Sequence, residues 1–224
     1  QWENYTDAFA SADFGQYTIN TLTIVFGNLI GTLVTASMAA FAFSRLKWRG
    51  QKAVFYLILS TLMLPGAVTL IPQFLIWSNL KLVDTFWPLI LPSFMGGGAY
   101  NIFLLRQFFL GIPKELDESA KIDGATASQT LFRIIIPLSK SALIVVGLFT
   151  FLNAWNDFFG PIIYLNSKEK YTLAIGLLQF QGDYSTKWNL IMAASTIVVA
   201  PTIVVYLLGQ KYIIGGISLS RMKA

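Results

Sequence analysis

Long apolar runs alternate with short polar stretches along this chain, and the apolar runs determine the fold that we expect. Each run is close to the roughly 20 helical residues needed to cross a hydrocarbon layer of about 30 Å. We therefore expect five membrane-spanning helices, over Ile19 to Phe43, Ala53 to Trp77, Phe86 to Leu110, Ala142 to Leu165 and Asn189 to Tyr212. The expected fold class is an all-α polytopic membrane protein. No repeat and no Pro/Ser-rich linker divides the chain, so one domain is expected.

Helix-breaking residues lie inside several of these runs. They are Pro65, Pro72, Pro88, Pro92, Pro161, Pro201 and the triplet Gly96 to Gly98. Membrane helices tolerate such residues when neighbouring helices provide partners for the freed backbone groups. Kinked packing helices are the favoured interpretation, and hinges that line a pore are the alternative.

Composition supports the membrane class and removes several kinds of chemistry. Of 224 residues, 55% are hydrophobic and only 12% are charged, which is more apolar surface than a soluble domain of this length could bury. The chain has no Cys and no His, so we expect no thiol or histidine catalysis and no metal site of the usual kind. The net charge of +5 comes without a basic stripe, and no nucleic-acid partner is expected.

The distribution of Lys and Arg predicts the orientation of the chain. If residues 1–18 are external, the cytoplasmic side receives twelve of the sixteen cations: Arg45, Lys47, Arg49, Lys52, Arg106, Lys114, Lys121, Arg133, Lys140, Lys211, Arg221 and Lys223. Cytoplasmic loops of membrane proteins are enriched in such residues. Within the transmembrane domain 19–212 we therefore expect a cytoplasmic loop at 111–140, followed by a cytoplasmic tail at 213–224. Because residues 1–18 contain no signal peptide, a sixth span is expected before Gln1.

A polar island between the third and fourth apolar runs predicts a helix at the cytoplasmic surface. The stretch from Pro113 to Ile122 places three acids, Glu115, Asp117 and Glu118, near the positive end of a helix dipole. The dipeptide Asp123-Gly124 is typical of a turn that ends such a helix.

A second helix is expected directly after this turn. Thr126 and Gln129 have the spacing of a capping box, which would open a helix that continues to Pro137. The island therefore predicts a helix-turn-helix elbow, whose second helix leads into the span that begins near Ala142.

The island also resembles a known motif. Glu118-Ser119-Ala120, three residues, Gly124, nine residues and then Ile134-Ile135-Ile136-Pro137 are similar to the EAA loop of ABC importer permeases. Ser119 replaces the first Ala of that pattern and Ile136 replaces a Leu. Further segments resemble the second permease subunit of maltose-type carbohydrate importers, namely Ala40 to Gln51, Met63 to Phe74, Phe103 to Leu116 and Trp155 to Leu165. The resemblance implies a type I ABC importer transmembrane fold with six spans.

This resemblance implies a function and a set of partners. The chain would be the permease subunit of a binding-protein-dependent, ATP-driven importer for a sugar or oligosaccharide, a multi-pass protein of the prokaryotic cytoplasmic (inner) membrane. It would pair with a second permease subunit, two cytoplasmic ATPase subunits and an external solute-binding protein. No phosphate-binding G-x-x-x-x-G-K-[ST] motif occurs in this chain, so ATP and Mg²⁺ are expected in the ATPase subunits and no cofactor or catalytic residue here. An ion-coupled secondary transporter is the alternative, although only Asp157 is a candidate intramembrane acid.

The resemblance also assigns residues to the contact with the ATPase. In the elbow they are Glu118, Ser119, Ala120, Asp123, Gly124, Ala125 and Thr126. Gly124 would provide the sharp turn, and Ala120 and Ala125 would permit close approach. Glu118 and Asp123 either contact the ATPase or cap the elbow's own helices. In the tail, Ser218, Ser220 and Arg221 are expected to contact the ATPases, with a frayed terminus as the alternative.

Four residues near the fourth apolar run are candidates for the substrate pathway: Asn153, Trp155, Asn156 and Asp157. An acid at membrane depth is costly, and amides with aromatic faces suit sugars. The favoured alternative is structural, with Trp155 in an interfacial belt and Asp157 capping a broken helix or pairing with a partner subunit.

Overall fold

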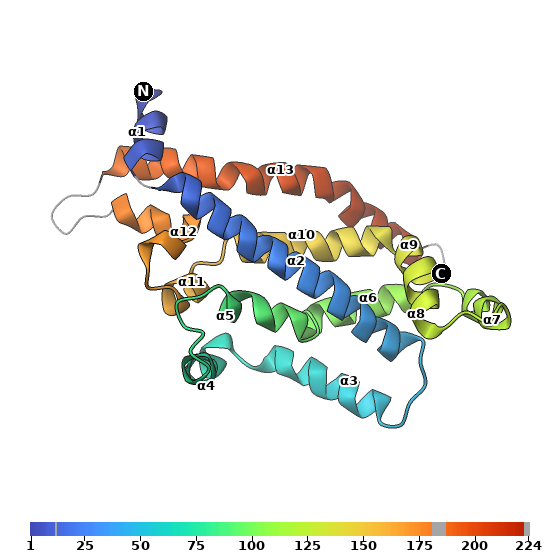
Figure 1. Ribbon diagram of the computed structural model, residues 1–224. Coiled ribbons are helices and arrows are strands. Elements are labelled where there is room, and N and C mark those ends of the chain that lie inside the picture. Colours follow the sequence, from blue (N-terminus) through green and yellow to red (C-terminus); the bar gives the residue numbers. More distant parts are fainter. Residues whose placement is uncertain (12, 181–186, 222–224) are drawn as a thin grey trace.

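The computed structural model describes residues 1–11, 13–180 and 187–221, and every regular element in these ranges is helical (Figure 1). The α-helices are α1 (Glu3–Ser11), α2 (Phe14–Ser44), α3 (Gln51–Ser60), α4 (Gly66–Asn79), α5 (Trp87–Ile90), α6 (Ala99–Leu110), α7 (Glu115–Ile122), α8 (Ala127–Thr130), α9 (Ile136–Leu138), α10 (Lys140–Trp155), α11 (Phe159–Tyr164), α12 (Leu173–Gly176) and α13 (Trp188–Arg221). Short 3-10 turns lie at Thr61–Met63, Leu91–Phe94, Lys168–Lys170 and Leu177–Phe180, and a π-turn lies at Leu131–Ile135.

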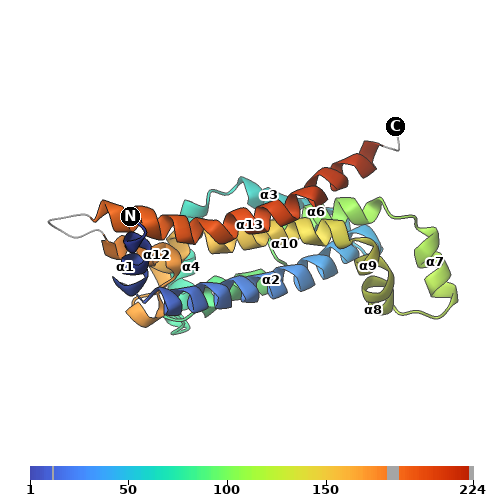
Figure 2. The same ribbon diagram turned by 90° about the horizontal axis from the view of Figure 1, so that it is seen from above.

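Four helices lie side by side and form the body of the molecule. Helix α2 packs against α6 and α10, and α10 packs against α13 (Figures 1 and 2). Small residues on α2, among them Ala36 and Ala40, are completely buried, which allows neighbouring backbones to approach closely. Large apolar side chains such as Phe26, Ile30 and Leu207 remain exposed on the outside, as expected where lipid or another subunit replaces water.

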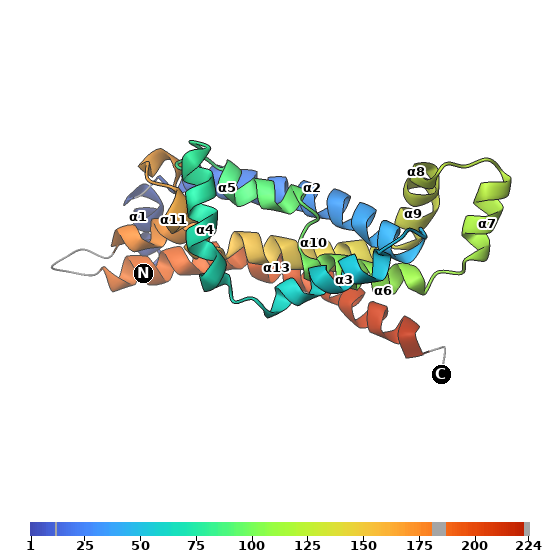
Figure 3. The ribbon, with the colours of Figure 1, turned by 90° about the horizontal axis from the view of Figure 1, so that it is seen from below.

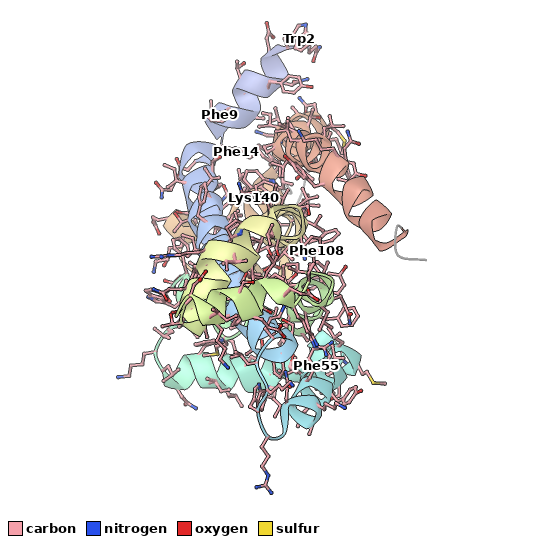
Figure 4. The ribbon with its side chains drawn as sticks, turned by 90° about the vertical axis from the view of Figure 1, so that its right-hand side faces the viewer. Trp2, Phe9, Phe14, Phe55, Phe108 and Lys140 are labelled. Atoms are coloured by element: carbon pink, nitrogen blue, oxygen red, sulfur yellow. The ribbon has the colours of Figure 1, made fainter. Side chains whose placement is uncertain are left out.

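The buried side chains form two clusters, one toward each end of the bundle. The first joins Phe41, Phe55, Leu105, Phe109 and Ile135 near the polar island. The second gathers side chains of α1, α2, α10, α12 and α13 at the opposite end: Ala8, Phe14, Tyr17, Trp155, Leu173 and Ala194 among others. Figure 4 looks along the bundle from the island's end, with Phe55 of α3 and Phe14 of α2 lying far apart in the view.

Three stretches within the described residues are long and apolar enough to cross a membrane: Phe14–Ser44, Trp87–Leu110 and Trp188–Tyr212. They correspond to the first, third and fifth predicted spans. The number rises to five only if each of two strongly bent helix pairs is counted as one span. The all-helical, multi-span prediction is therefore confirmed, and the second, third and fourth expected spans contain breaks.

The second predicted span, Ala53 to Trp77, is not one continuous helix. It breaks at Leu64 and Pro65, and the two halves meet at 103°. Pro65 has an extended backbone (φ −60°, ψ 135°) and no N–H to continue the helix. Helix α4 therefore runs across the end of the bundle instead of prolonging α3 (Figure 3). Pro72, in contrast, stays inside α4.

The third predicted span contains an internal break at the glycine triplet. Gly96, Gly97 and Gly98 all have positive φ, at 101°, 67° and 88°. A Cβ on Gly97 would lie 3.0 Å from the Cα of Thr32, so the chain passes close to α2 there. The break separates the Leu91–Phe94 turn from α6.

The ends of the remaining helices also differ from the prediction. Helix α10 ends at Trp155, and a non-helical link precedes the short α11, so Ala142 to Leu165 is not a single span. Helix α13 keeps Pro201 in its interior and continues to Arg221, nine residues beyond the predicted end at Tyr212. Helix α1 occupies part of the stretch that was expected only as an external segment.

Candidate functional site: the elbow Glu115–Leu138

The polar island forms an elbow, defined here as Glu115–Leu138, that projects from one end of the bundle (Figures 2 and 3). Its first arm is α7, which begins at Glu115 rather than at Pro113. Three acids lie in the first turn and Lys121 lies in the last turn, as favoured by the helix dipole. The predicted first helix is confirmed to within two residues.

The turn of the elbow depends on a left-handed glycine. Gly124 has φ +77°, and its N–H donates to the carbonyl of Lys121 at 3.1 Å. The N–H of Ala125 reaches back to the carbonyl of Ala120 at 2.9 Å, which closes the end of α7 in the manner of a Schellman motif. A Cβ on Gly124 would meet nothing within 4 Å. The requirement for glycine is therefore conformational, not steric.

The predicted capping box is present at the start of the second arm. The Thr126 hydroxyl accepts from the Gln129 N–H at 3.3 Å, and the Gln129 side-chain oxygen accepts from the Thr126 N–H at 2.8 Å. The arm continues through the π-turn to α9 and then bends by 83° into α10. The second helix therefore meets the following span at an angle instead of continuing straight into it. Ser139 lies at this bend and is completely buried.

Most of the residues expected to contact an ATPase lie on the outer surface of the elbow. They are Glu118, Ser119, Asp123, Gly124 and Thr126. Ala120 differs, since it is only 5% exposed and packs inside the chain, and Ala125 is half-buried. Ala120 is therefore not on the exposed surface of the elbow.

Two acids on the elbow are free of contacts in the part of the chain that the structure describes. Neither the Glu118 nor the Asp123 carboxylate makes a hydrogen bond or ion pair there. Ile122, next to Asp123 in the chain, is 86% exposed, and Phe132 on the second arm is 51% exposed. Of the two roles considered for these acids, capping within the elbow therefore has no supporting contact.

Arg45 also contacts the elbow, although it lies outside the EAA-like motif. It follows the last residue of α2, and its Nη1 lies 2.9 Å from Oδ2 of Asp117 in α7. Its Nη2 donates to the carbonyl oxygens of Phe109 and Ile112. The segment Ala40 to Gln51 carries part of the family resemblance, but its partners lie 64 to 72 positions away in the chain.

The four pathway candidates separate into two pairs. Trp155 is buried, and its Nε1 donates to the carbonyl of Val198 in α13 at 3.0 Å. Asp157 accepts from the Gly160 N–H at 3.0 Å, at the start of α11. Asp157 thus caps the helix that follows a break, as the structural alternative expected, whereas Trp155 lies in the buried core and not in an interfacial belt. Asn153 and Asn156 are exposed, and Asn156 donates to the carbonyl of Leu152 at 2.8 Å.

The backbone of the three tail candidates lies within α13. The side chains of Ser218, Ser220 and Arg221 lie outside the described part of the structure.

The chain is similar in sequence to known transport proteins over most of its length. Residues 31–218 match the family model of the binding-protein-dependent transport system inner membrane component. The chain is 34% identical to the probable ABC transporter permease protein YurM of Bacillus subtilis, over 99% of this chain and 73% of that protein. It is 32% identical to the arabinooligosaccharides transport system permease protein AraQ of the same organism, over 99% and 79%. It is 33% identical to the sn-glycerol-3-phosphate transport system permease protein UgpE of Yersinia pestis, over 92% and 74%.

Solved structures agree with these relatives. A chain of a bacterial ABC transporter involved in the import of the acidic polysaccharide alginate superposes with a TM-score of 0.84, at 26% identity, over 93% of this chain and 78% of that one. The MetNI methionine ABC transporter in an inward-facing conformation shares the fold alone, with a TM-score of 0.65 at 15% identity over 88% and 93% of the two chains. The chain belongs to the family of binding-protein-dependent transport system inner membrane components.

Proposed function

We propose that this chain is the transmembrane permease subunit of an ATP-driven importer that takes up a sugar or oligosaccharide. The support comes from the family match and from relatives named for arabinooligosaccharides, diacetylchitobiose and sn-glycerol-3-phosphate transport. A second permease subunit would complete the translocation pathway, and an external solute-binding protein would deliver the substrate. The ion-coupled alternative is not favoured by any of these relatives.

The elbow Glu115–Leu138 is the element that we propose for coupling to a separate ATPase. The observation that carries this proposal is its surface: among the described residues the Glu118 and Asp123 carboxylates have no hydrogen-bond or ionic partner, Ile122 beside them is exposed, and Phe132 is exposed on the second arm. Apolar anchors beside unpaired polar groups are typical of a surface that a partner covers. The excess of Lys and Arg at this end favours a cytoplasmic location.

ATP hydrolysis is proposed to take place in the partner ATPase subunits. ATP with Mg²⁺ would bind to two ATPase subunits, since this chain lacks a phosphate-binding loop. Closure of the ATPase pair would displace the elbow and, through the bend at Ser139, α10. Rigid-body movement of a helix against its neighbours is a common way to switch access in such proteins.

Reconstitution tests this function. The chain, its partner permease, the ATPase subunits and the binding protein are placed in proteoliposomes, and uptake of labelled sugar is followed. Uptake is expected to require internal ATP and to stop when the ATPase Walker lysine is replaced, with no effect of ion gradients. Uptake that continues with the inactive ATPase, driven by an ion gradient, would contradict the proposal.

For the substrate pathway we propose only the two exposed amides, Asn153 and Asn156. Their replacement by Ala is expected to raise the sugar concentration needed for half-maximal uptake while the complex remains assembled. Unchanged uptake kinetics in both variants would remove them from the pathway. Ser218, Ser220 and Arg221 stay candidates for a second contact with the ATPases, which deletion of residues 218–224 would test through co-purification of the ATPase subunits.

A further inference from the structure

Arg45 makes an unusual set of contacts for a cation at the end of a membrane helix. Its side chain is only 3% exposed, whereas Asp117, its ionic partner, is 24% exposed. The guanidinium reaches three acceptors in two segments: the carboxylate of Asp117 in α7, and the carbonyls of Phe109 and Ile112 at and beyond the end of α6. The planar guanidinium offers five donors in a fixed fork, which holds separated acceptors in a defined geometry.

The arrangement is not the one that stability alone would favour. Arg45 Nε and Asp117 Oδ1 are buried and have no hydrogen-bond partner among the described residues. A buried ion pair with unmet polar atoms contributes little net stability, because the cost of desolvation offsets the attraction. The same contacts do fix the geometry of the groups involved. Positioning of α7 is the role that these contacts support.

In the described part of the chain, Arg45 makes the only side-chain polar contact between α7 and another helix. No other hydrogen bond or ion pair there joins a side chain of α7 to another helix of the bundle. Arg106 provides the contrast: its Nε donates to the Phe43 carbonyl at 3.0 Å and its guanidinium lies 4.3 Å from the centre of the Phe55 ring. Arg106 thus ties α6 to α2 and α3 and leaves the elbow untouched.

The far end of α2 is fastened as well. Asn20 donates to the carbonyls of Glu169 and Tyr171 at 2.7 and 2.9 Å, and the Thr21 hydroxyl accepts from the Leu173 N–H at 3.0 Å. Helix α2 is continuous over its 31 residues, which is about 46 Å at about 1.5 Å per residue. A displacement imposed at Arg45 can therefore reach the segment Glu169–Leu173 at the opposite end of the molecule.

We infer that Arg45 is a positioning residue for coupling, which holds the first turn of α7 on the end of α2 so that movement of the elbow is passed to α2 as well as to α10. This inference rests on the proposed coupling function of the elbow. It adds a second route to the covalent one through Ser139, and it assigns a role to the arginine in the segment Ala40 to Gln51.

The test compares Arg45→Gln, Asp117→Asn and the double variant in the reconstituted complex, with Arg106→Gln as the matched control for loss of a partly buried arginine. The readout is the amount of sugar transported per ATP hydrolysed, together with the ATPase activity in the absence of binding protein. We expect both single variants to keep that basal activity and to lose about tenfold in the transport ratio, with the double variant no worse than either. Arg106→Gln is expected to keep the wild-type ratio.

Two results would overturn the inference. One is a wild-type ratio in Arg45→Gln and Asp117→Asn; the other is a loss that is fully explained by fewer ATPase subunits in the purified complex. Asp117→Asn keeps the side-chain shape, so it serves if Arg45→Gln does not fold. The variant Lys121→Cys, tested for a cross-link to the ATPase, separates the two proposals. No cross-link in the otherwise wild-type complex contradicts the coupling function itself, while a retained cross-link with an unchanged ratio contradicts only the role of Arg45.

Discussion

The Lys170 ammonium lies 2.9 Å from Oδ2 of Asp84 and also donates to the main-chain carbonyl of Asp84. The same carboxylate accepts hydrogen bonds from the backbone N–H groups of Asn166 and Ser167 and from the Ser167 hydroxyl. Asp84 itself has a positive φ of 60°. These contacts fasten the loop between α4 and α5 to the loop after α11, at the end of the molecule opposite the elbow.

Acidification is expected to weaken this junction. Hydrogen bonds from Ser167 and Lys170 hold the pKa of Asp84 well below its usual range. The unfolded chain would therefore take up the proton first, near the ordinary aspartate value of about 4. The stabilisation is present above that pH and is lost as the pH falls toward the lower folded-state pKa.

Replacement of Asp84 by Asn measures the size of this effect. We expect a loss of about 1–2 kcal/mol at neutral pH, since charge-assisted hydrogen bonds are removed from a group that is partly exposed. Thermal unfolding of the wild type and the variant should differ at neutral pH, and the difference should begin to shrink only below about pH 4, as the pH falls toward the folded-state pKa of Asp84. A gap between the two unfolding temperatures that stays constant over this range would disprove the assignment.

The conformation of Gly124 predicts a graded response to substitution. A side chain in the left-handed region costs about 1–2 kcal/mol, and Asn tolerates it better than a β-branched residue. We expect Gly124→Val to reduce sugar uptake about tenfold with normal membrane levels, and Gly124→Asn to retain most of it. Gly50→Val is the control, since Gly50 has φ +87° and equally open surroundings outside the elbow. Equal losses from the Gly50 and Gly124 variants would remove the special role of the elbow's turn.

The hydrogen bond between Trp155 and Val198 predicts a stability effect. Trp155→Phe keeps an aromatic ring beside Phe151, 5.4 Å between ring centres, but removes the indole N–H that donates to the Val198 carbonyl. Loss of one buried hydrogen bond costs about 0.5–1.5 kcal/mol. The purified complex should therefore unfold at a lower temperature. Trp188→Phe removes an exposed tryptophan and is expected to change nothing; a lowered unfolding temperature in that control alone would contradict the prediction.

The close contact between α2 and the turn after α5 predicts that Gly31 cannot be replaced by a residue with a side chain without loss of stability. A Cβ there would meet the Ser93 hydroxyl and would lie 2.7 Å from the Phe94 ring. Overpacking of this kind costs about 1–3 kcal/mol. Gly31→Ala is expected to lower the yield of monodisperse protein in size-exclusion chromatography. Gly15→Ala, on the same helix with open space around it, should leave the yield unchanged or improved.

The elbow was the most predictable part of the molecule because its signals are local. The turn at Gly124 and the capping box of Thr126 and Gln129 involve residues within a few positions of one another. The bend at Pro65 was less predictable. A proline removes one hydrogen bond, but whether the helix continues past it, as at Pro72, or turns by 103°, as at Pro65, depends on what packs around it.

Contacts between residues far apart in the chain could not be predicted for this site. Nothing near Arg45 in the chain indicates that its guanidinium is buried against Asp117, 72 positions later. Trp155 illustrates the same limit, since its donor meets a carbonyl 43 residues away in α13. The sequence therefore identified which residue types could serve, while the packing of α2, α10 and α13 decided which of them were already engaged.

The π-turn Leu131–Ile135 gives the spacing of the motif a meaning in terms of angle. Nine residues separate Gly124 from Ile134, and they include the first three residues of the π-turn, Leu131 to Arg133. Each residue of an α-helix contributes about 100° of rotation, so removal of one residue here would swing α7 and its exposed Ile122 about a third of a circle around the second arm. The number of residues in the elbow therefore determines the direction in which its exposed surface faces.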